Sequence, residues 1–397
     1  MRIAMFTDSY LPTRDGVVSS ILSTKERLEE MGHEVIVFAP DPGDEGLKEE
    51  GTVYFRSIAY KRYDGYRIPL FPTNKCEIIR DLDVDVIHSQ GLLFMALRSM
   101  FAGRSLRLPV VVSFHTMITE AMGFYAGLPL PQWIMERLFW RYLRSLMERA
   151  EVVIAPTHAV LDQLRGLAPR MKRGEVIPTG VDCVKFHPQV SGRAIRDRFG
   201  LNHHKVVMHL GRIAWEKNLD LVLESFQDLC ARRDDVRMMI VGEGPAKQHY
   251  MEEVISLDLE DKVIFTGFVP DEELPQFYAA CDAFVLASKF ETQGLVVLEA
   301  MATGKPVACI DYRATAEIVD DGVDGFLFND DRASCSETME KALYSPESLR
   351  RRAREKAERY SRREGSERLV GMYRLAIEQK RARDGEKLTR KGTPHRG

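Results

Sequence analysis

Short apolar segments alternate with helical patterns along most of the chain, and this alternation constrains the fold more than any other feature. Residues 3–6 and 35–39 have the pattern of strands, and residues 17–31 between them have the pattern of a helix. A strand, a helix and a strand of these lengths form a βαβ unit, which implies a parallel sheet. The pattern starts again at 206–210, which a helix at 219–229 follows. We therefore predict an α/β protein in two parts of similar architecture.

Composition narrows the class without fixing the function. The 397 residues are enough for two core-bearing domains, with 45% hydrophobic and 29% charged residues, as in ordinary globular proteins. A net charge of -3 argues against bulk electrostatic binding of nucleic acid, so we expect no nucleic-acid partner. The six cysteines show no CxxC pair or metal-ligand spacing. We interpret them as small buried hydrophobic residues.

The N-terminal pattern and the length of the apolar runs indicate where in the cell the protein is expected. The first residues enter a strand pattern without the layout of a signal peptide, and no apolar run approaches the ~20 residues that span a bilayer. We expect a cytoplasmic protein, and peripheral attachment to the cytoplasmic face of a membrane stays open.

Two glutamates surround a predicted strand-to-helix turn. Residues 283–287 form an apolar strand, Glu291 follows it, and the chain turns at Gly294 into good helix formers that include Glu299, about two turns into the helix. The free N–H groups at a helix start favour anions. Carboxylates beside an anion site suit a molecule that is half anion and half polyol. A nucleotide sugar is such a molecule.

Two cations follow the strand at 206–210. Gly211 and Arg212 come directly after it, and Lys217 lies just before the next helix. The carboxyl ends of parallel strands are the ligand-binding edge of such a sheet. The guanidinium of Arg212, which can donate two parallel hydrogen bonds, and the ammonium of Lys217 can neutralise a diphosphate there. The alternative is solvated surface charge.

Another strand, at 263–266, ends in Gly267, Phe268 and Val269. Backbone groups at this position could pair with a nucleobase. The turn at 242–245 lacks the third glycine of the dinucleotide-binding fingerprint, so alone it is weak support for a cofactor site.

The first half offers two candidate site residues. Gly16 opens the helix at 17–31, where a glycine lets a ligand approach the backbone, although a turn alone could also require it. His115 follows the strand at 110–114, again at a ligand-binding edge, and Thr116 comes next. A structural histidine is the alternative. The acidic string at 83–85 precedes a strand and so lies at the wrong edge, and we reject it as a metal site.

A helix at 131–149 could contact lipid. It carries two of the three tryptophans and one polar stripe, made of Arg137, Arg141, Arg144 and Glu148. Arginines with aromatic residues favour anionic membrane surfaces. An ordinary amphipathic helix with its apolar side on the core is the alternative.

These residues together resemble glycosyltransferase family 4, whose members are retaining enzymes. The signature is the Glu291–Glu299 pair within Glu-Thr-Gln-Gly-Leu-Val-Val-Leu-Glu. Supporting motifs occur in the expected order, namely the loop ending at Gly16, Phe114-His115-Thr116, Ile177 to Asp182, and Gly211 to Lys217. The resemblance covers the chain to about residue 373 and implies the GT-B fold, in which two Rossmann-like domains with parallel sheets face each other across a cleft.

The resemblance and the repeated pattern give expected boundaries. They are an acceptor-side N-terminal domain (1–185), a nucleotide-sugar-binding domain (186–360), a C-terminal helix that crosses back to the first domain (361–380) and a mobile basic tail (381–397).

By resemblance, each motif takes a role in sugar transfer. Arg212 and Lys217 would hold the donor diphosphate, and the amides of Gly294 and Leu295 would add the field of the helix end. Glu291 would bind sugar hydroxyls and Glu299 the ribose. The other donor-binding positions would be Gly16, Gly211, Gly267, Phe268, Val269, Thr292 and Gln293. His115 would contact the sugar near the reacting carbon, and no metal or other cofactor would be required.

Local details resemble the branch that glycosylates diacylglycerol-type or phosphatidylinositol-type lipids, as in the stretch 7–18 and in Met117 and Tyr125. Asp15 stands where many relatives have a second glycine, and residues 314–316 replace a common glycine-rich turn before Glu317. We expect a hexosyltransferase using a UDP-glucose or GDP-mannose type of donor and a membrane glycerolipid acceptor. A soluble acceptor is the alternative, and a nucleotide-sugar epimerase or a non-catalytic binder fits less well. The sequence is silent on oligomeric state.

Overall fold

The computed structural model describes residues 1–13, 16–59, 67–70, 76–115 and 132–391. The chain divides into two compact units, Met1–Pro178 with Arg363–Gly397, and Thr179–Arg362. The division falls seven residues before the boundary that we expected at 185, and the chain returns to the first unit at Arg363. Met117 and Tyr125, which carried part of the lipid-branch resemblance, and Asp15 and Thr116 lie outside the described residues.

The first unit is built on a seven-stranded parallel sheet, in the order β3-β2-β1-β6-β7-β8-β9. Its elements are β1 (Arg2–Phe6), α1 (Gly16–Glu30), β2 (Glu34–Pro40), η1 (Glu45–Leu47), β3 (Val53–Phe55), β4 (Ser57–Ala59), β5 (Arg67–Pro69), α2 (Cys76–Asp81), β6 (Val86–Ser89), α3 (Phe94–Leu106), β7 (Val110–Ser113), α5 (Gln132–Arg149), β8 (Val152–Ala155), α6 (His158–Leu167), β9 (Gly174–Val176) and most of α15 (Arg362–Lys391). Strands β4 and β5 form a separate antiparallel pair.

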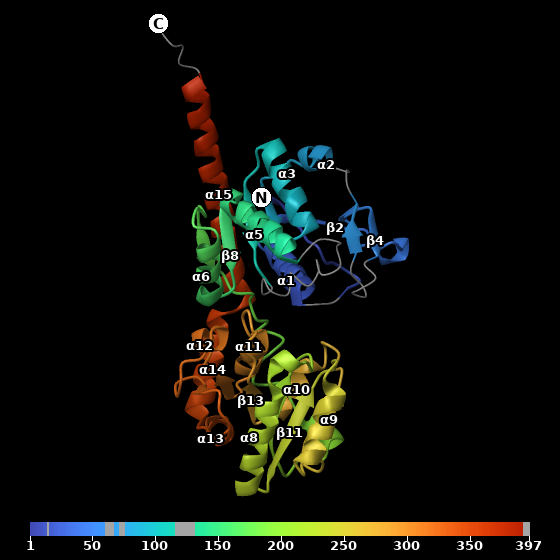
Figure 1. The fold of residues 1–397 in the computed structure, drawn as a ribbon, viewed down its shortest axis with the longest axis vertical. Helices are drawn as coiled ribbons and strands as arrows, with labels where there is room; N and C mark the ends of the chain where they lie inside the picture. The colour runs from blue at the N-terminus through green and yellow to red at the C-terminus, as the bar shows by residue number, and fades with distance from the viewer. Residues whose placement is uncertain (14–15, 60–66, 71–75, 116–131, 392–397) are drawn as a thin grey trace. The chain divides into compact units, whose positions relative to one another are not determined.

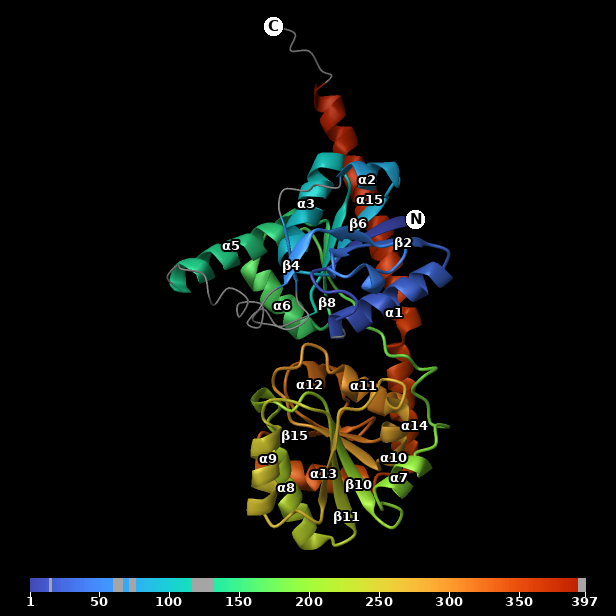
Figure 2. The same ribbon diagram turned by 90° about the vertical axis from the view of Figure 1, so that its right-hand side faces the viewer.

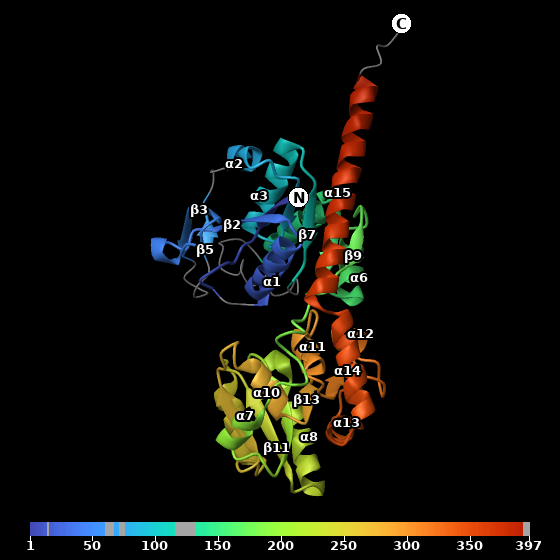
Figure 3. The same cartoon turned by 180° about the vertical axis from the view of Figure 1, so that it is seen from behind.

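Alternation along each strand divides the core of this unit between the two faces of the sheet. Ala4 and Phe6 pack with α3, α5 and α6 on one face, whereas Ile3 and Met5 pack with α1 and α15 on the other. Successive strand residues point to opposite faces, so a sheet covered on both sides needs apolar residues at every position. Figure 3 shows α15 running along the first unit on the same side as α1.

The second unit repeats this design with a six-stranded parallel sheet in the order β12-β11-β10-β13-β14-β15. Its elements are α7 (Arg193–Arg198), β10 (Lys205–Leu210), η3 (Trp215–Lys217), α8 (Leu219–Arg232), β11 (Val236–Val241), α9 (Lys247–Ser256), β12 (Val263–Gly267), α10 (Leu274–Ala280), β13 (Ala283–Leu286), α11 (Leu295–Ala302), β14 (Val307–Ile310), α12 (Ala314–Ile318), β15 (Phe326–Phe328), α13 (Arg332–Leu343) and α14 (Glu347–Arg359). Figure 2 shows this unit with its helices on both sides of the strands.

Both sheets follow the doubly wound strand order. Successive strands are added on one side of the first strand, and the later strands are then added on its other side. The reversal lies between β1 and β6 in the first unit and between β10 and β13 in the second. Loops leaving the two central strands diverge there, so the carboxyl edge opens into a crevice at which ligands bind. The α/β class with two parallel sheets that we predicted is confirmed.

Some local expectations need correction. Helix α11 begins at Leu295, so Glu299 lies little more than one turn into it rather than two. Helix α15 continues to Lys391, so it includes the first eleven residues (381–391) of the stretch that we expected to be a mobile basic tail. The short strands β9 and β15 were not expected from the sequence, because three residues carry too little periodicity to be recognised.

Candidate active site

A cation and a carboxylate meet at the carboxyl edge of the second sheet. Lys217 lies in η3, on the loop after β10, and Glu291 lies on the loop after β13. The Nζ atom of Lys217 is 2.7 Å from Oε1 of Glu291, and the side chains are 20% and 17% exposed. β10 and β13 are the strands that border the reversal of the sheet, so the ion pair lies where a ligand is expected. The geometry therefore brings together two residues that the sequence placed on separate motifs.

Two glycines let the neighbouring loops lie against each other. A Cβ on Gly242 would be 2.0 Å from the carbonyl oxygen of Gly211, and one on Gly244 would be 2.1 Å from that of Ile213. Gly242 N–H also donates to the carbonyl of Gly267 at 3.0 Å. The glycine turn at 242–245 thus serves backbone packing under the loop that carries Arg212. Arg212 itself is exposed at this edge.

The start of α11 presents backbone N–H groups at the same edge. Gly294 caps the helix in the left-handed region, with φ at 75°, and Leu295 is the first helical residue. The side-chain amide of Gln293 is occupied in this structure, since its Oε1 accepts from the N–H of Thr179 and its Nε2 donates to the carbonyl of Thr179, both at 2.7 Å. Gln293 therefore holds the backbone of Thr179 close to the helix start. Thr292 lies between Glu291 and Gln293 on the same loop.

Glu299 lies deeper than Glu291 and has a different environment. Its Oε2 accepts a hydrogen bond from the hydroxyl of Tyr278 at 2.7 Å. Burial raises the pKa of the Glu299 carboxyl to about 7, and the hydrogen bond from Tyr278 opposes this rise. A carboxyl poised near neutral pH can pair with a hydroxyl group as acceptor or as donor.

The residues predicted to face a nucleobase also lie at this edge. Gly267 ends β12 with φ at 76°, and Phe268 and Val269 follow. Phe268 is 77% exposed, which is unusual for so large an apolar side chain. An exposed aromatic ring at this edge can stack on a planar ligand.

In the first unit, His115 belongs to a hydrogen-bonded chain that the sequence did not reveal. It follows β7, and its Nε2 pairs with Oε1 of Gln90, which follows β6. Nδ1 of His88, on β6, lies 3.3 Å from Nε2 of Gln90, and the His88 side chain is buried. Its other partners are Ser113 and Tyr373. Gln90 was detectable as a polar residue at a strand end, whereas Tyr373, on α15, gave no signal.

Gly16 begins α1 and is exposed, and a Cβ there would meet nothing within 4 Å. Its φ does not lie in the left-handed region either. Neither packing nor backbone conformation therefore requires a glycine at this position, which favours the prediction that a ligand approaches it.

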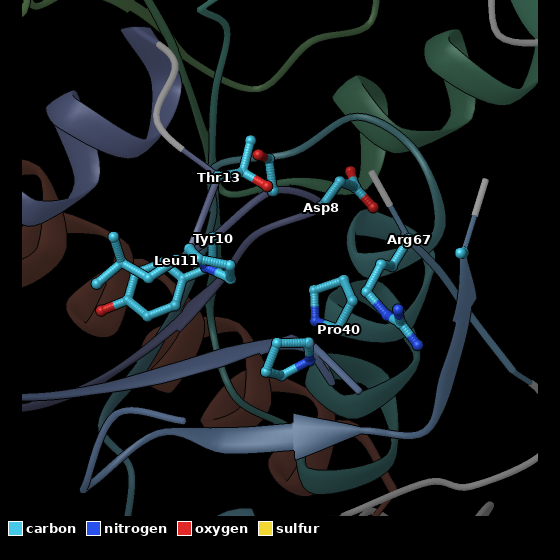
Figure 4. Close-up of a pocket in the computed structure, with 10 residues that line it drawn as sticks. Asp8, Tyr10, Leu11, Thr13, Pro40 and Arg67 are labelled. Carbon is cyan, nitrogen blue, oxygen red and sulfur yellow. The ribbon is translucent and has the colours of Figure 1, made fainter. Parts of the chain in front are cut away.

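A pocket of about 220 Å³ lies beside the loop after β1 (Figure 4). Tyr10, Leu11, Pro40 and Arg67 are among the residues that line it. Asp8, at its edge, accepts from the N–H groups of Leu93 and Met95 at 2.8 Å and so stabilises the start of α3.

Comparison with known proteins bears on the family of the chain. The family model described as "Glycosyltransferase Family 4" matches residues 14–185, and "Glycosyl transferases group 1" matches residues 193–360. A sulfoquinovosyl transferase of Arabidopsis thaliana is 30% identical over 377 residues, which cover 90% of this chain and 70% of that protein. The chain belongs to glycosyltransferase family 4. An alpha-monoglucosyldiacylglycerol synthase of Streptococcus pneumoniae is 29% identical over 355 residues, covering 87% of this chain and 79% of the relative.

Solved structures give the same fold. The Anabaena protein HepE, solved in complex with UDP, superimposes with a TM-score of 0.74 at 19% identity, over 94% of this chain and 99% of that one. The family 4 chain therefore has the GT-B fold, and it is a glycosyltransferase that uses nucleotide-sugar donors.

One possible ligand set was not apparent from the sequence of this family 4 chain. Asp220, His249 and Glu253 bring their ligand atoms within 4.8 Å of one another. His249 Nε2 lies 3.6 Å from Asp220 Oδ1 and 3.9 Å from Glu253 Oε2. About half of each of the Asp220 and His249 side chains is exposed, and an ion-pair network on the surface accounts for the cluster.

Helix α5 of the family 4 chain combines a buried face with an exposed stripe. Phe139, Leu143 and Leu146 are in the core, as the amphipathic alternative predicted. Trp133 and Leu138, however, are 65% and 54% exposed. The arginines of the stripe, Arg137, Arg141 and Arg144, are exposed as well. Across the described residues, no helix is both long enough and apolar enough to cross a membrane.

Proposed function

We propose that the protein is a retaining hexosyltransferase that moves a sugar from a UDP-glucose or GDP-mannose type of donor to a hydroxyl of a membrane glycerolipid. The observation that carries the proposal is the Lys217–Glu291 pair at the carboxyl edge of the second sheet, 2.7 Å apart and largely shielded from water. An anion-binding cation and a hydroxyl-binding carboxylate in direct contact match the junction of a sugar and a diphosphate.

When the donor binds, contacts with its diphosphate and sugar would replace the contact between Lys217 and Glu291. A diphosphate at Lys217 would be completed by Arg212 and by the backbone N–H groups at Gly294 and Leu295. Glu291 would then accept hydrogen bonds from sugar hydroxyls, and Glu299 would pair with the ribose. Phe268 would offer its exposed ring, and Gly267 and Val269 their backbone groups, to the base.

Retention would follow from substitution on one face of the sugar. The bond from the anomeric carbon to the leaving phosphate oxygen breaks as the acceptor oxygen bonds to the same carbon, and that phosphate oxygen takes the acceptor proton. Lys217 and Arg212 would stabilise the charge on the leaving diphosphate, which is the task that a metal ion performs in other transferases. We therefore propose that transfer needs no metal ion.

The relatives and helix α5 support a lipid acceptor. The printed name of the pneumococcal relative includes diacylglycerol. On this chain, Trp133 and Leu138 are exposed beside Arg137 and Arg141, a combination that favours an anionic membrane surface. We propose peripheral attachment to the cytoplasmic face of the membrane through this stripe.

The decisive experiment is a screen of UDP- and GDP-sugars with a lipid extract, followed by determination of the anomeric configuration of the product. Lys217→Ala and Glu291→Ala should each lower transfer at least about tenfold, which corresponds to roughly 1.4 kcal/mol. Lys262→Ala is a matched control, because Lys262 also forms an ion pair, with Asp234 at 3.2 Å, outside the site. Full activity in both site variants would contradict the assignment, and transfer lost to a chelator and restored by a divalent ion would contradict the metal-free mechanism.

Sedimentation with vesicles tests the membrane surface. The protein should pellet with vesicles containing anionic lipid, and the double variant Arg137→Glu and Arg141→Glu should stay in the supernatant. Arg193→Glu, a change of an exposed arginine in the second unit, should pellet like the unchanged protein. Transfer to soluble sugars without vesicle binding would favour the alternative of a soluble acceptor.

A further inference from the structure

The side chain of Gln293 bonds to both backbone polar groups of a single residue. Its Oε1 accepts from the N–H of Thr179 and its Nε2 donates to the carbonyl of Thr179, each at 2.7 Å. Gln293 is 6% exposed, so its amide is buried in the second unit. Because a buried amide loses free energy when it gives up such bonds, this geometry favours a role for Gln293 toward Thr179 over the donor contact that the resemblance implied.

Thr179 lies where the chain enters the second unit. The first unit ends at Pro178, and the chain returns to it at Arg363. The backbone therefore passes between the units at two crossings, one beside Thr179 and one beside Arg362. The amide of Gln293 acts directly on the entering crossing.

The entering and returning segments are bonded to each other. The N–H of Val181 donates to the carbonyl of Tyr360 at 2.8 Å, and the N–H of Arg362 donates to the carbonyl of Val181 at 3.1 Å. A Cβ on Gly180 would lie 2.3 Å from the Cα of Arg362, so the glycine permits this close approach. The guanidinium of Arg362 also lies 2.8 Å from Oδ2 of Asp182. The two crossings therefore pack together, and Gln293 holds the residue that precedes this packing.

Gln293 also directly precedes the backbone groups that we expect to bind the donor. It lies on the loop after β13 with Glu291, and Gly294 and Leu295 follow it. A diphosphate bound to the N–H groups of Gly294 and Leu295 would restrain this loop. The restraint would reach Thr179 through the amide of Gln293. One side chain thus connects the donor-binding loop to the crossings between the units.

We propose that Gln293 is a positioning residue that makes the conformation of the crossings depend on the nucleotide bound at the start of α11. The inference rests on the proposed function, because it assumes that the donor diphosphate binds there. With nucleotide bound, Gln293 holds Thr179 and the entering crossing in one conformation. The residues that we assign to transfer are divided between the two units, so loss of this restraint should lower turnover more than nucleotide affinity.

Gln293→Leu is the test, because it nearly keeps the size of the side chain and deletes both bonds to Thr179. The matched control is Gln227→Leu in the same unit. Gln227 also uses both ends of its amide, since Nε2 donates to the carbonyl of Leu257 at 2.8 Å and Oε1 accepts from Arg332 at 3.0 Å. The control shows what the loss of a bonded amide costs away from the crossings.

Amide hydrogen exchange of the full chain, followed by mass spectrometry on peptides that cover residues 176–182, reports on the N–H of Thr179. Exchange is measured for each protein alone and with saturating UDP or GDP. Calorimetric titration gives the Kd of the nucleotide, and transfer assays give kcat.

Bound nucleotide should slow exchange in residues 176–182 of the unchanged protein and of Gln227→Leu. Without nucleotide, Gln293→Leu should exchange at Thr179 at least about fivefold faster than the unchanged protein, because the N–H has lost its acceptor. Nucleotide should no longer slow exchange in this variant. Its Kd for nucleotide should change by less than about threefold, and its kcat should fall about tenfold.

Three results would overturn the proposal. Slowing by nucleotide that persists in Gln293→Leu would show that the restraint does not pass through this amide. A Kd raised about tenfold or more would make Gln293 a donor contact instead. Nucleotide binding without slowed exchange in the unchanged protein would refute the coupling alone. If neither UDP nor GDP binds to the unchanged protein, the proposed function fails and the coupling fails with it, so the two failures are distinguished by the titration.

Discussion

The carboxyl of Glu299 makes the stability of the second unit depend on pH in a direction that the structure specifies. Burial raises its pKa from 4.5 to about 7 in the folded chain. A group whose pKa is raised on folding binds more protons in the folded state, so it stabilises the fold fully below pH ~4.5 and this contribution is lost as the pH rises through about 7. At ~1.4 kcal/mol per pH unit, the complete effect is at most roughly 3 kcal/mol. Because part of the side chain still meets solvent, we expect about half of this.

Replacing Glu299 by Gln should remove this dependence, since an amide keeps the size of the side chain and does not titrate. Calorimetric melting of the full chain between pH 5 and pH 8 gives the midpoints of both proteins. The difference between them should change by several degrees across this range, because ~1 kcal/mol moves the midpoint of a unit of this size by roughly 2–4 °C. Glu260→Gln, which changes an exposed carboxylate in the same unit, is the matched control. Parallel pH profiles for the unchanged protein and Glu299→Gln would refute the reasoning.

Two backbone positions give further tests by thermal melting. Gly242→Ala should destabilise the protein by more than about 2 kcal/mol, because its Cβ would lie 2.0 Å from the carbonyl oxygen of Gly211. Gly200→Ala, also at positive φ but with nothing within 4 Å, should cost only about 1 kcal/mol, and equal losses would contradict the steric argument. Arg313 adopts φ 45° and ψ -110°, so Arg313→Gly should stabilise the fold by about 1 kcal/mol. An unchanged or lower midpoint would mean that the arginine side chain offsets the backbone strain.

The sequence predicted the strands well, because buried parallel strands are continuous apolar runs between turns. It also predicted which side chains follow the strands, and His115 and Lys217 both lie at the carboxyl edges as expected. The short pair β4 and β5 was not found, since three residues on each strand are held by pairing rather than by their own pattern.

Partners far apart in the chain could not be predicted. Lys217 and Glu291 are 74 residues apart, and Gln293 and Thr179 are 114 apart. Which loops meet depends on the order of strands in the sheet, and a local pattern fixes the strands but not their order. The glycine turn at Gly242 shows the same limit. From the sequence it was weak support for a dinucleotide site, whereas in the fold it lets one loop pack on another.

The strand order reverses at equivalent strands in the two sheets, but different kinds of polar side chain lie at the two positions. The second unit holds a charged pair, Lys217 and Glu291, and charges attract a phosphate over several ångströms. The first unit holds neutral groups, His88 and Gln90, whose hydrogen bonds depend on which atom carries the proton. Charge suits the capture of an anion, whereas fixed neutral donors and acceptors suit the orientation of hydroxyls. Changes at Lys217 should therefore lower turnover as well as donor affinity, because the cation that attracts the diphosphate would also stabilise the charge on it as it leaves.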